Sequence, residues 1–516
     1  MCGLVAAIGP AALDPAAVRR ALDALDHRGP DGSGEVVLAN ARVTLGHRRL
    51  ATTAPWNGHQ PIASEDGQIV AIVNGQIYEH RRWRATLEAL GHRFTTDSDS
   101  EVLVHLWEER GPAAIEALRG ELAFALWDAR RGRLYAGRDR FGIKPLVWGR
   151  LGSAVVIASE AKALLAYGVP AQWSRDGVEH LLCHQFLPPT ETLFHGIHAV
   201  PPATVLCCDQ EGVVTQTAYW TLPRAPSTGP ADPDETATLV QEAVALRAQA
   251  DAPTAFALSG GLDSSAIVAA AVRLGARRPQ AFGIRFGDPA WDEAGLAADT
   301  AVALGADFHP VPVADSDYLT GLDAAVFFSE GVASNGQLVA KWALAQAVGR
   351  AGFKVLLTGE GADEAFLGYA HLLEDAGCLT DRPHHQVGVM LPSGGTPPET
   401  RGFEALAGGV PTFLAAKGEL GRRLRALCAP DTVPDPEARF RRLAESLGPE
   451  LGDRAPVERS AVAWTRLALA GYILRTLGDG TEMAAGVEGR PPFLDHHLFE
   501  HSWASPIAAR IAGGVE

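Results

Sequence analysis

The chain has 516 residues, 47% of them hydrophobic and 21% charged, with a formal net charge of −16. This length exceeds what one hydrophobic core usually supports, so the sequence predicts two domains of an ordinary soluble enzyme. The negative charge argues against nucleic acid as a partner. No basic segment followed by an apolar run begins the chain, and no apolar stretch is long enough to cross a membrane. We therefore expect a cytoplasmic protein without a membrane partner.

Short strands separated by turn signals are expected from residue 2 to about residue 209. Helices are predicted at residues 15–25 and 100–109, and strands at 69–74, 121–127 and 134–138. The run TLPRAPSTGPADPDE at residues 221–235 is rich in Pro, Thr and Asp, which do not sustain a helix or a central strand. We therefore place a first domain at residues 1–215 and a linker at residues 216–235.

The rest of the chain, residues 236–516, alternates between strand and helix patterns. Strands are predicted at residues 254–258, 280–286 and 354–358, with helices starting at Asp263 and near Glu293. This alternation is typical of a parallel sheet flanked by helices. Residues 371–456 are rich in Pro, Gly and Arg and show a weaker pattern, which we interpret as a helical insertion.

Cysteine usage predicts neither a disulfide framework nor a zinc site, because no CxxC pair or His-rich ligand spacing accompanies the scattered cysteines. Cys2 is different. Removal of Met1 would leave Cys2 with a thiol and a free α-amine. An amine with a pKa of roughly 8 is a suitable base for a thiol with a pKa of about 8.5. This pairing suggests acyl transfer through a thioester. A retained Met1 would turn this amine into an amide and disable the base.

The segment SGGLDSS, residues 259–265, follows the apolar strand TAFAL and opens a helix. Its glycines, hydroxyls and free backbone N–H groups at a helix N-terminus form an anion site suited to pyrophosphate. It is not a Walker-type loop, which would read GxxxxGK[ST].

A second segment, GEGADE at residues 359–364, follows the buried strand KVLLT, so it lies at the same carboxyl edge of the sheet. Its carboxylates beside a phosphate site predict Mg²⁺, with Asp263 and Asp363 as ligands. The residues predicted to bind ATP are Leu258, Ser259, Gly260, Gly261, Asp263, Ser264, Ser265, Gly359 and Glu360.

With these motifs the chain resembles the asparagine synthetase B family. The family joins an α+β N-terminal-nucleophile (αββα) glutaminase, a class II glutamine amidotransferase domain, to an α/β ATP-pyrophosphatase domain of the adenine nucleotide alpha hydrolase type. SGGLDSS is similar to the family's pyrophosphate loop, and GEGADE to the motif whose first glutamate, here Glu360, is implicated in catalysis. The resemblance implies that glutamine yields ammonia, that ATP adenylates an acceptor carboxylate, and that ammonia displaces AMP. It also implies a homodimer formed through the glutaminase.

The resemblance extends through the first half, to residues 27–32, 48–50, 74–75 and 98–99. A thioester-forming glutaminase needs hydrogen-bond donors for its oxyanion, which the Asn74 amide and the Gly75 N–H are expected to supply beside Cys2. The α-carboxylate and α-ammonium of glutamine suit an arginine fork and an aspartate. Arg49 and Asp99 match the family positions for these tasks.

Two departures from the family pattern stand out. Where most members read NGEIYNH, residues 74–80 read NGQIYEH, so the glutamate that helps to neutralise the donor's ammonium is Gln76 here. Its loss costs about 1–2 kcal/mol if the group is desolvated. At residues 490–495, RPPFLD replaces RVPFLD, and the chain ends about where a catalytic lysine of the family is expected. We favour a truncated sequence over the loss of this cation.

The predicted function is glutamine-dependent, ATP-consuming amidation of aspartate or of a natural-product carboxylic acid, with ammonia crossing a passage of mostly apolar walls. One alternative is transfer of another nitrogen nucleophile from a glutamine analogue to a carboxylate other than aspartate. Another is a non-catalytic nucleotide-binding homologue. The pyrophosphate loop argues against a phosphoribosyl-pyrophosphate amidotransferase, and the intact glutaminase residues argue against ring-closing relatives.

Overall fold

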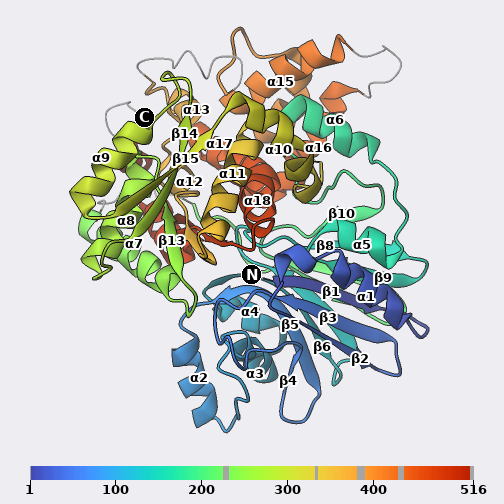
Figure 1. Cartoon of the computed structure of the whole chain (residues 1–516). Helices are drawn as coiled ribbons and strands as arrows, with labels where there is room; N and C mark the ends of the chain where they lie inside the picture. The colour runs from blue at the N-terminus through green and yellow to red at the C-terminus, as the bar shows by residue number, and fades with distance from the viewer. Residues whose placement is uncertain (1, 225–231, 332–334, 380–389, 428–434, 512–516) are drawn as a thin grey trace.

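The computed structural model describes residues 2–224, 232–331, 335–379, 390–427 and 435–511 (Figure 1). The first half contains two six-stranded antiparallel sheets. One has the strand order β10-β8-β9-β1-β3-β2, with β1 (Cys2–Ile8), β2 (Gly32–Leu38), β3 (Val43–Arg49), β8 (Val147–Leu151), β9 (Ala154–Ala158) and β10 (Ile197–Ala199). The other has the order β12-β11-β7-β6-β5-β4, with β4 (Ile62–Ala63), β5 (Ile69–Ile77), β6 (Gly120–Asp128), β7 (Arg133–Arg138), β11 (Thr204–Cys208) and β12 (Val214–Ala218).

The two sheets pack face to face between helices. Strand β1 is buried along its whole length because its side chains alternate between two cores. Leu4 and Ile8 face the second sheet, whereas Val5 and Ala7 face the helical layer. The helices of this half are α1 (Pro15–Asp23), α2 (His80–Ala89), α3 (Glu101–Arg110), α4 (Ala114–Ala117), α5 (Ala161–Tyr167) and α6 (Arg175–His184), with short turns η1 (Asp26–Arg28) and η2 (Gly111–Ala113). The αββα layering expected from the resemblance is confirmed.

The second half is built on a five-stranded parallel sheet of order β15-β14-β13-β16-β17. Its strands are β13 (Thr254–Ala257), β14 (Gln280–Phe286), β15 (Asp307–Val313), β16 (Val355–Leu357) and β17 (Glu488–Arg490). The helices around it are α7 (Pro233–Ala248), α8 (Leu262–Arg273), α9 (Ala294–Leu304), α10 (Asp315–Phe328), α11 (Gln337–Arg350), α12 (Ala362–Phe366), α18 (Thr481–Met483), α19 (His496–Ala504) and α20 (Ile507–Arg510), with the turn η8 (Pro492–Leu494). Separate apolar cores on its two faces confirm the predicted α/β layering.

The predicted insertion is helical where it is described. It contains α13 (Ala370–Asp375), η4 (Pro398–Thr400), α14 (Arg401–Ala407), α15 (Thr412–Arg425), α16 (Pro436–Leu447), η6 (Gly448–Leu451) and the start of α17 (Pro456–Trp464). Residues 380–389 and 428–434 lie outside the described residues. A π-helix, η7 (Thr465–Gly480), then leads back to the sheet.

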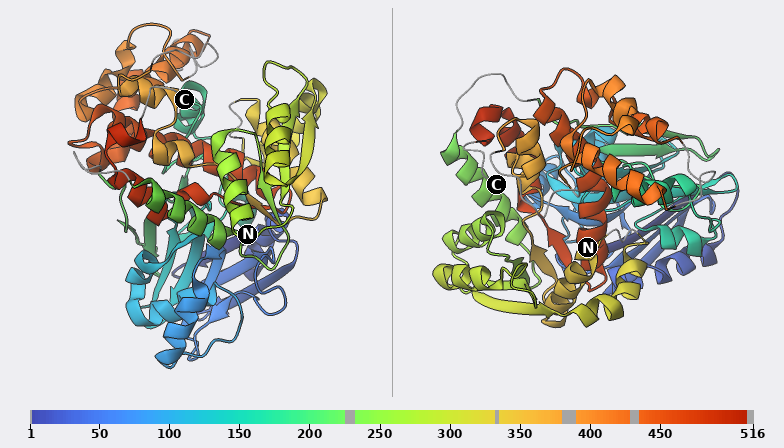
Figure 2. Two further views of the ribbon diagram at one scale, coloured as in Figure 1. Left: turned by 90° about the vertical axis from the view of Figure 1, so that its left-hand side faces the viewer. Right: turned by 90° about the horizontal axis from the view of Figure 1, so that it is seen from above.

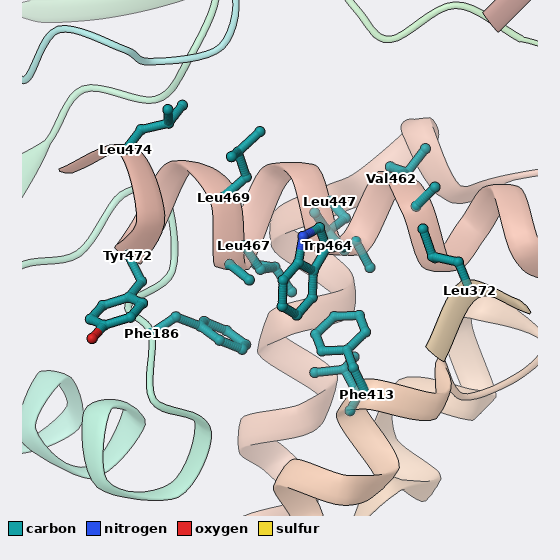
Figure 3. Close-up of a cluster of buried hydrophobic side chains, with 14 of the residues drawn as sticks. Phe186, Leu372, Phe413, Leu447, Val462, Trp464, Leu467, Leu469, Tyr472 and Leu474 are labelled. Carbon is teal, nitrogen blue, oxygen red and sulfur yellow. The ribbon is translucent and has the colours of Figure 1, made fainter. Parts of the chain in front are cut away.

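The insertion shares one apolar core with both halves of the chain. Trp464 packs edge-on against Phe413 with ring centroids 5.1 Å apart, and Leu467 and Tyr472 of η7 extend the same cluster (Figure 3). Phe186, which follows α6 of the first half, lies in this cluster as well. In the left view of Figure 2 the antiparallel sheets lie below, and the parallel sheet and the insertion form two lobes above them.

The junction between the halves differs slightly from the predicted linker. Strand β12 continues three residues beyond the predicted end of the first domain, to Ala218, and α7 begins before residue 236. The early start of α7 has a local cause, because the Asp232 side chain accepts hydrogen bonds from the N–H groups of Asp234 and Glu235, with Pro233 at the first helical position. Residues 225–231 of the predicted linker lie outside the described residues. The domain limits themselves stay a prediction. None of the described helices is long and apolar enough to cross a membrane.

Candidate active site

Cys2 is the first residue of β1, is 6% exposed, and pairs in register with Arg49 of β3. Its backbone nitrogen donates a hydrogen bond to Asn74 Oδ1 at 2.7 Å, and its carbonyl accepts one from Arg28 Nε at 3.0 Å. Burial raises the pKa of the Cys2 thiol, although the Arg49 charge acts in the opposite direction. The thiol therefore needs a base before it can react at neutral pH.

A vacant hydrogen-bond donor lies beside Cys2. Asn74 is fully buried, and its Nδ2 has no hydrogen-bond partner among the described residues. The next residue, Gly75, has a φ of +136°, and a Cβ there would lie 1.9 Å from the Glu121 carbonyl oxygen. Only glycine fits at this point of β5. A buried donor left without a partner is what an oxyanion would satisfy.

The two residues predicted to hold glutamine are both buried. The Arg49 guanidinium donates to the carbonyls of Thr53 at 3.0 Å, Ala54 at 2.5 Å and Pro55 at 3.3 Å. Asp99 accepts a hydrogen bond from the Ile77 N–H, at the end of β5, at 2.7 Å, and burial raises the pKa of this carboxyl group. A cavity of about 990 Å³ opens next to the Arg49-bound loop.

Gln76 connects the glutaminase half to the second half of the chain. Its Oε1 accepts hydrogen bonds from Thr53 Oγ1 and from Arg490 Nη2, both at 3.0 Å. Arg490 is also paired with Glu488 two residues earlier on β17, at 2.7 Å. The Arg490 charge is thus already balanced by Glu488, so a neutral amide at position 76 is a sufficient partner.

A pocket of about 450 Å³ lies at the carboxyl edge of the parallel sheet. Seven of the predicted ATP- or metal-binding residues line it, namely Leu258, Ser259, Asp263, Ser264, Gly359, Glu360 and Asp363. Burial raises the pKa of Asp263.

Three predicted ATP-binding residues, Gly260, Gly261 and Ser265, shape the loop instead of lining this pocket. Gly260 has a φ of +89°, and a Cβ there would lie 2.8 Å from the Ala297 nitrogen. Ser265 Oγ donates to the Gly261 carbonyl at 2.7 Å. The loop therefore keeps its close approach to α9 because residue 260 has no side chain.

Lys341, on α11, is a pocket residue that the sequence analysis missed. Its ammonium forms an ion pair with Glu360 inside the pocket. Burial opposes ionisation of Glu360, but the Lys341 charge outweighs it and holds the pKa of Glu360 below its usual range. The second carboxylate oxygen of Glu360 has no hydrogen-bond partner among the described residues. No motif surrounds Lys341 in the sequence, so only the packing of α11 on the sheet reveals it.

A small cavity of about 20 Å³ lies behind Glu360, toward the glutaminase half. Its lining includes the ionisable residues Lys144, Glu360, Asp479 and Glu482, whereas most of its wall surface is apolar. The predicted passage of mostly apolar walls for ammonia stays a prediction. Burial and, to a smaller extent, the neighbouring Glu360 carboxylate raise the pKa of Glu482 to about 8. Glu482 is therefore mostly protonated at neutral pH.

Arg28 links this cavity to Cys2. Besides holding the Cys2 carbonyl, its fully buried guanidinium pairs with Glu160 at 2.6 Å and with both carboxylate oxygens of Asp479, at 2.6 and 3.0 Å. Asp479 belongs to η7 and lines the cavity behind Glu360. Buried polar groups thus connect the nucleophile candidate to a cavity that Glu360 of the ATP pocket candidate also lines.

Both halves of the chain match known protein families. Residues 1–220 match the family model described as glutamine amidotransferase domain, and residues 235–516 match the one described as asparagine synthase. The chain belongs to the asparagine synthetase B family. The family match identifies a glutamine-hydrolysing carbon–nitrogen ligase that uses ATP, with glutamine and a carboxylate acceptor as substrates.

Proteins similar to this chain have two kinds of name. The protein named amidase chyE, from Penicillium rubens, is 32% identical, over 94% of this chain and 77% of its own length. A putative glutamine-hydrolysing asparagine synthetase from Mycobacterium tuberculosis is 30% identical, over 99% of this chain and 83% of its own length. Both names refer to amide chemistry, and only the second name specifies a product, asparagine.

We predict that Asn74→Asp lowers the kcat of glutamine hydrolysis at least 100-fold, since loss of one oxyanion donor costs about 100–1000-fold. The substitution keeps an oxygen acceptor for the Cys2 nitrogen, removes the Nδ2 donor and adds a carboxylate charge beside the oxyanion. Glutamate release measures the rate, and Gln216→Ala on the exposed face of β12 is the control. A kcat within tenfold of wild type would show that Nδ2 is not an oxyanion donor.

The raised pKa of Glu482 predicts a pH-dependent stability. Because the folded-state value of about 8 exceeds the ordinary value of 4.5, the protonated form stabilises the fold at low pH, and this contribution is lost as pH rises from 4.5 to 8. Glu482→Gln cannot ionise, so its Tm relative to wild type should rise over this interval. Thermal unfolding measures the difference, with exposed Glu445→Gln as the control. Parallel profiles for Glu482→Gln and wild type would contradict the assignment.

Proposed function

We propose that Cys2 liberates ammonia from glutamine and that this ammonia amidates a carboxylate activated by ATP in the pocket formed by residues 259–265 and 359–364. The main observation in support of this proposal concerns the buried Arg28 guanidinium. It contacts the Cys2 carbonyl and also Asp479, which lines the cavity behind Glu360. This contact supports the proposal, because it joins the two candidate sites across one packed junction.

In the proposed glutaminase step the Cys2 sulfur attacks the γ-carbonyl carbon of glutamine. After removal of Met1, the Cys2 α-amine takes the thiol proton and gives it to the departing ammonia. Asn74 Nδ2 and the Gly75 N–H donate to the oxyanion. Water then hydrolyses the thioester, which releases glutamate. Arg49 and Asp99 hold the α-carboxylate and α-ammonium of glutamine, with Gln76 as a neutral neighbour.

In the proposed synthetase step the acceptor carboxylate attacks the α-phosphorus of ATP, and pyrophosphate leaves. The SGGLDSS loop binds the phosphates through its N–H groups and hydroxyls. Asp263 and Asp363, which line one pocket, would hold Mg²⁺, and the ion would neutralise phosphate charge there. Lys341 adds a positive charge beside Glu360. Ammonia then attacks the acyl carbon of the adenylate, and AMP leaves.

The acceptor is proposed to be a carboxylic acid with an apolar body, as in natural-product assembly. Aspartate would bring a second carboxylate, which needs a free cation. Among the described residues lining the pocket, Lys341 is the only Lys or Arg, and it is already paired with Glu360. Apolar side chains, including Leu344, Ile473 and Leu477, form much of the remaining wall. A cytoplasmic location and a homodimer through the first half stay predictions from the family resemblance.

The acceptor proposal predicts that Mg–ATP and glutamine support pyrophosphate release and amide formation with aryl or alkyl carboxylic acids, and not with aspartate. Pyrophosphate is measured enzymatically and the amide by mass spectrometry. Asparagine as the main product would overturn the acceptor proposal and leave the amidation reaction intact. Cys2→Ala, supplied with ammonium chloride, should retain amidation and lose its dependence on glutamine, which separates the two half-reactions.

Lys341→Ala is expected to slow pyrophosphate release by about 100-fold, because it leaves the Glu360 carboxylate without its counter-charge in the pocket proposed to hold the phosphates. Ammonium chloride should not rescue it, since the missing group acts before ammonia enters. Arg350→Ala, at the exposed end of the same helix α11, is the control. A rate unchanged from wild type would remove Lys341 from the reaction.

A further inference from the structure

Four potential metal ligands converge in the glutaminase half, on segments well separated in the sequence. Glu65 lies between β4 and β5, His92 follows α2, and His105 and Glu108 lie on α3. One ligand atom from each residue lies within 4.8 Å of all the others. His105 and Glu108 share a helix face because residues three apart are neighbours there.

The spacing of these atoms suits one tetrahedral ion. His105 Nδ1 lies 3.2 Å from a Glu108 oxygen and 3.5 Å from a Glu65 oxygen. His92 Nδ1 lies 3.4 Å from the same Glu108 oxygen and 3.6 Å from the other Glu65 oxygen. A tetrahedral zinc ion with bonds of about 2.0–2.1 Å requires ligand separations of about 3.3 Å. For either Glu65 oxygen, three of these distances belong to one set of four ligand atoms, and those three lie close to this value.

The outer nitrogens of both histidines face carboxylates. His92 Nε2 lies 2.9 Å from Glu109 Oε1, and His105 Nε2 lies 3.5 Å from Glu101 Oε1. A histidine that binds a metal through one nitrogen usually donates its other N–H to a carboxylate, which orients the ring. The hydrogen bond to Glu109 directs His92 Nδ1 toward the centre of the cluster. His105 Nε2 makes no hydrogen bond among the described residues, and its contact with Glu101 is longer.

The ligating carboxylates are held in place as well. Glu65 Oε1 accepts a hydrogen bond from the Arg93 N–H at 2.6 Å, and Glu108 Oε1 accepts one from Arg130 Nη2 at 2.7 Å. With Glu101 and Glu109, the cluster contains four carboxylates and one guanidinium around two imidazoles. A dication bound between neutral imidazoles would offset most of this excess negative charge.

We propose that Glu65, His92, His105 and Glu108 bind one Zn²⁺ ion in a structural site. Imidazole ligands disfavour Mg²⁺ and Ca²⁺, and four protein ligands leave no open position for catalysis. The ion would tie the β4–β5 turn and the segment after α2 to α3. The sequence analysis predicted no zinc site, because these ligands do not form a recognisable spacing.

The test uses the full-length protein, stripped with a chelator and titrated with Zn²⁺ by calorimetry. We expect one Zn²⁺ per chain and, with Zn²⁺ in excess, a rise in Tm on the order of 5 °C. Co²⁺ in its place should give the intense visible bands of tetrahedral coordination. Absence of stoichiometric binding by the wild type would overturn the proposal and would leave the proposed amidation reaction untouched.

Two variants assign the site. His92→Ala removes a ligand and should weaken Zn²⁺ binding at least 100-fold, whereas His195→Ala, an exposed histidine of the same half, should not change it. Glu109→Gln alters only the partner of His92 and should weaken binding about 10–100-fold. Because the Glu109 side chain is 42% exposed, this variant tests the site even if His92→Ala does not fold. Unchanged affinity in Glu109→Gln and His92→Ala would place any bound zinc elsewhere.

Discussion

The buried guanidinium of Arg28 is the interaction on which the arrangement of this amidotransferase depends. It contacts the Cys2 carbonyl, Glu160 of the same half and Asp479 of the other half, all without exposure to solvent. Removing one partner from such a buried pair typically costs about 3–5 kcal/mol, because the remaining charge is left unpaired. The position of Cys2, the nucleophile candidate, and the contact between the halves therefore rely on the same side chain.

Strand β17 makes a second connection of this kind. The first and last residues of β17, Glu488 and Arg490, contact the glutaminase half. Arg490 donates a hydrogen bond to Gln76, and Glu488 accepts one from Thr52 Oγ1 at 3.2 Å. Between them, the Gly489 carbonyl accepts a hydrogen bond from Lys144 Nζ at 2.9 Å. Gln76 is thus part of the junction as well as a candidate neighbour of glutamine. A substitution there would change the contact between the halves together with affinity for the nitrogen donor.

Buried charges also set the character of the candidate ATP pocket. Lys341 and Glu360 hold each other ionised, whereas Glu482, close to the same glutamate, is pushed toward its protonated form. Burial opposes ionisation of all three groups, so which of them carries charge depends on their pairing. A cation paired inside the pocket is compatible with phosphate chemistry and leaves less positive charge for a second carboxylate on the acceptor.

The sequence by itself determined the layered fold class and the residues that act through local backbone geometry. Cys2 at the start of a strand and the loops before α8 and α12 are encoded within a few neighbouring residues. Only the tertiary structure decided which distant side chains meet. Arg28 and Asp479 are 451 residues apart in the chain, and neither Lys341 nor the four zinc ligands belong to a motif. Their roles depend on packing between segments, which no local pattern of residues contains.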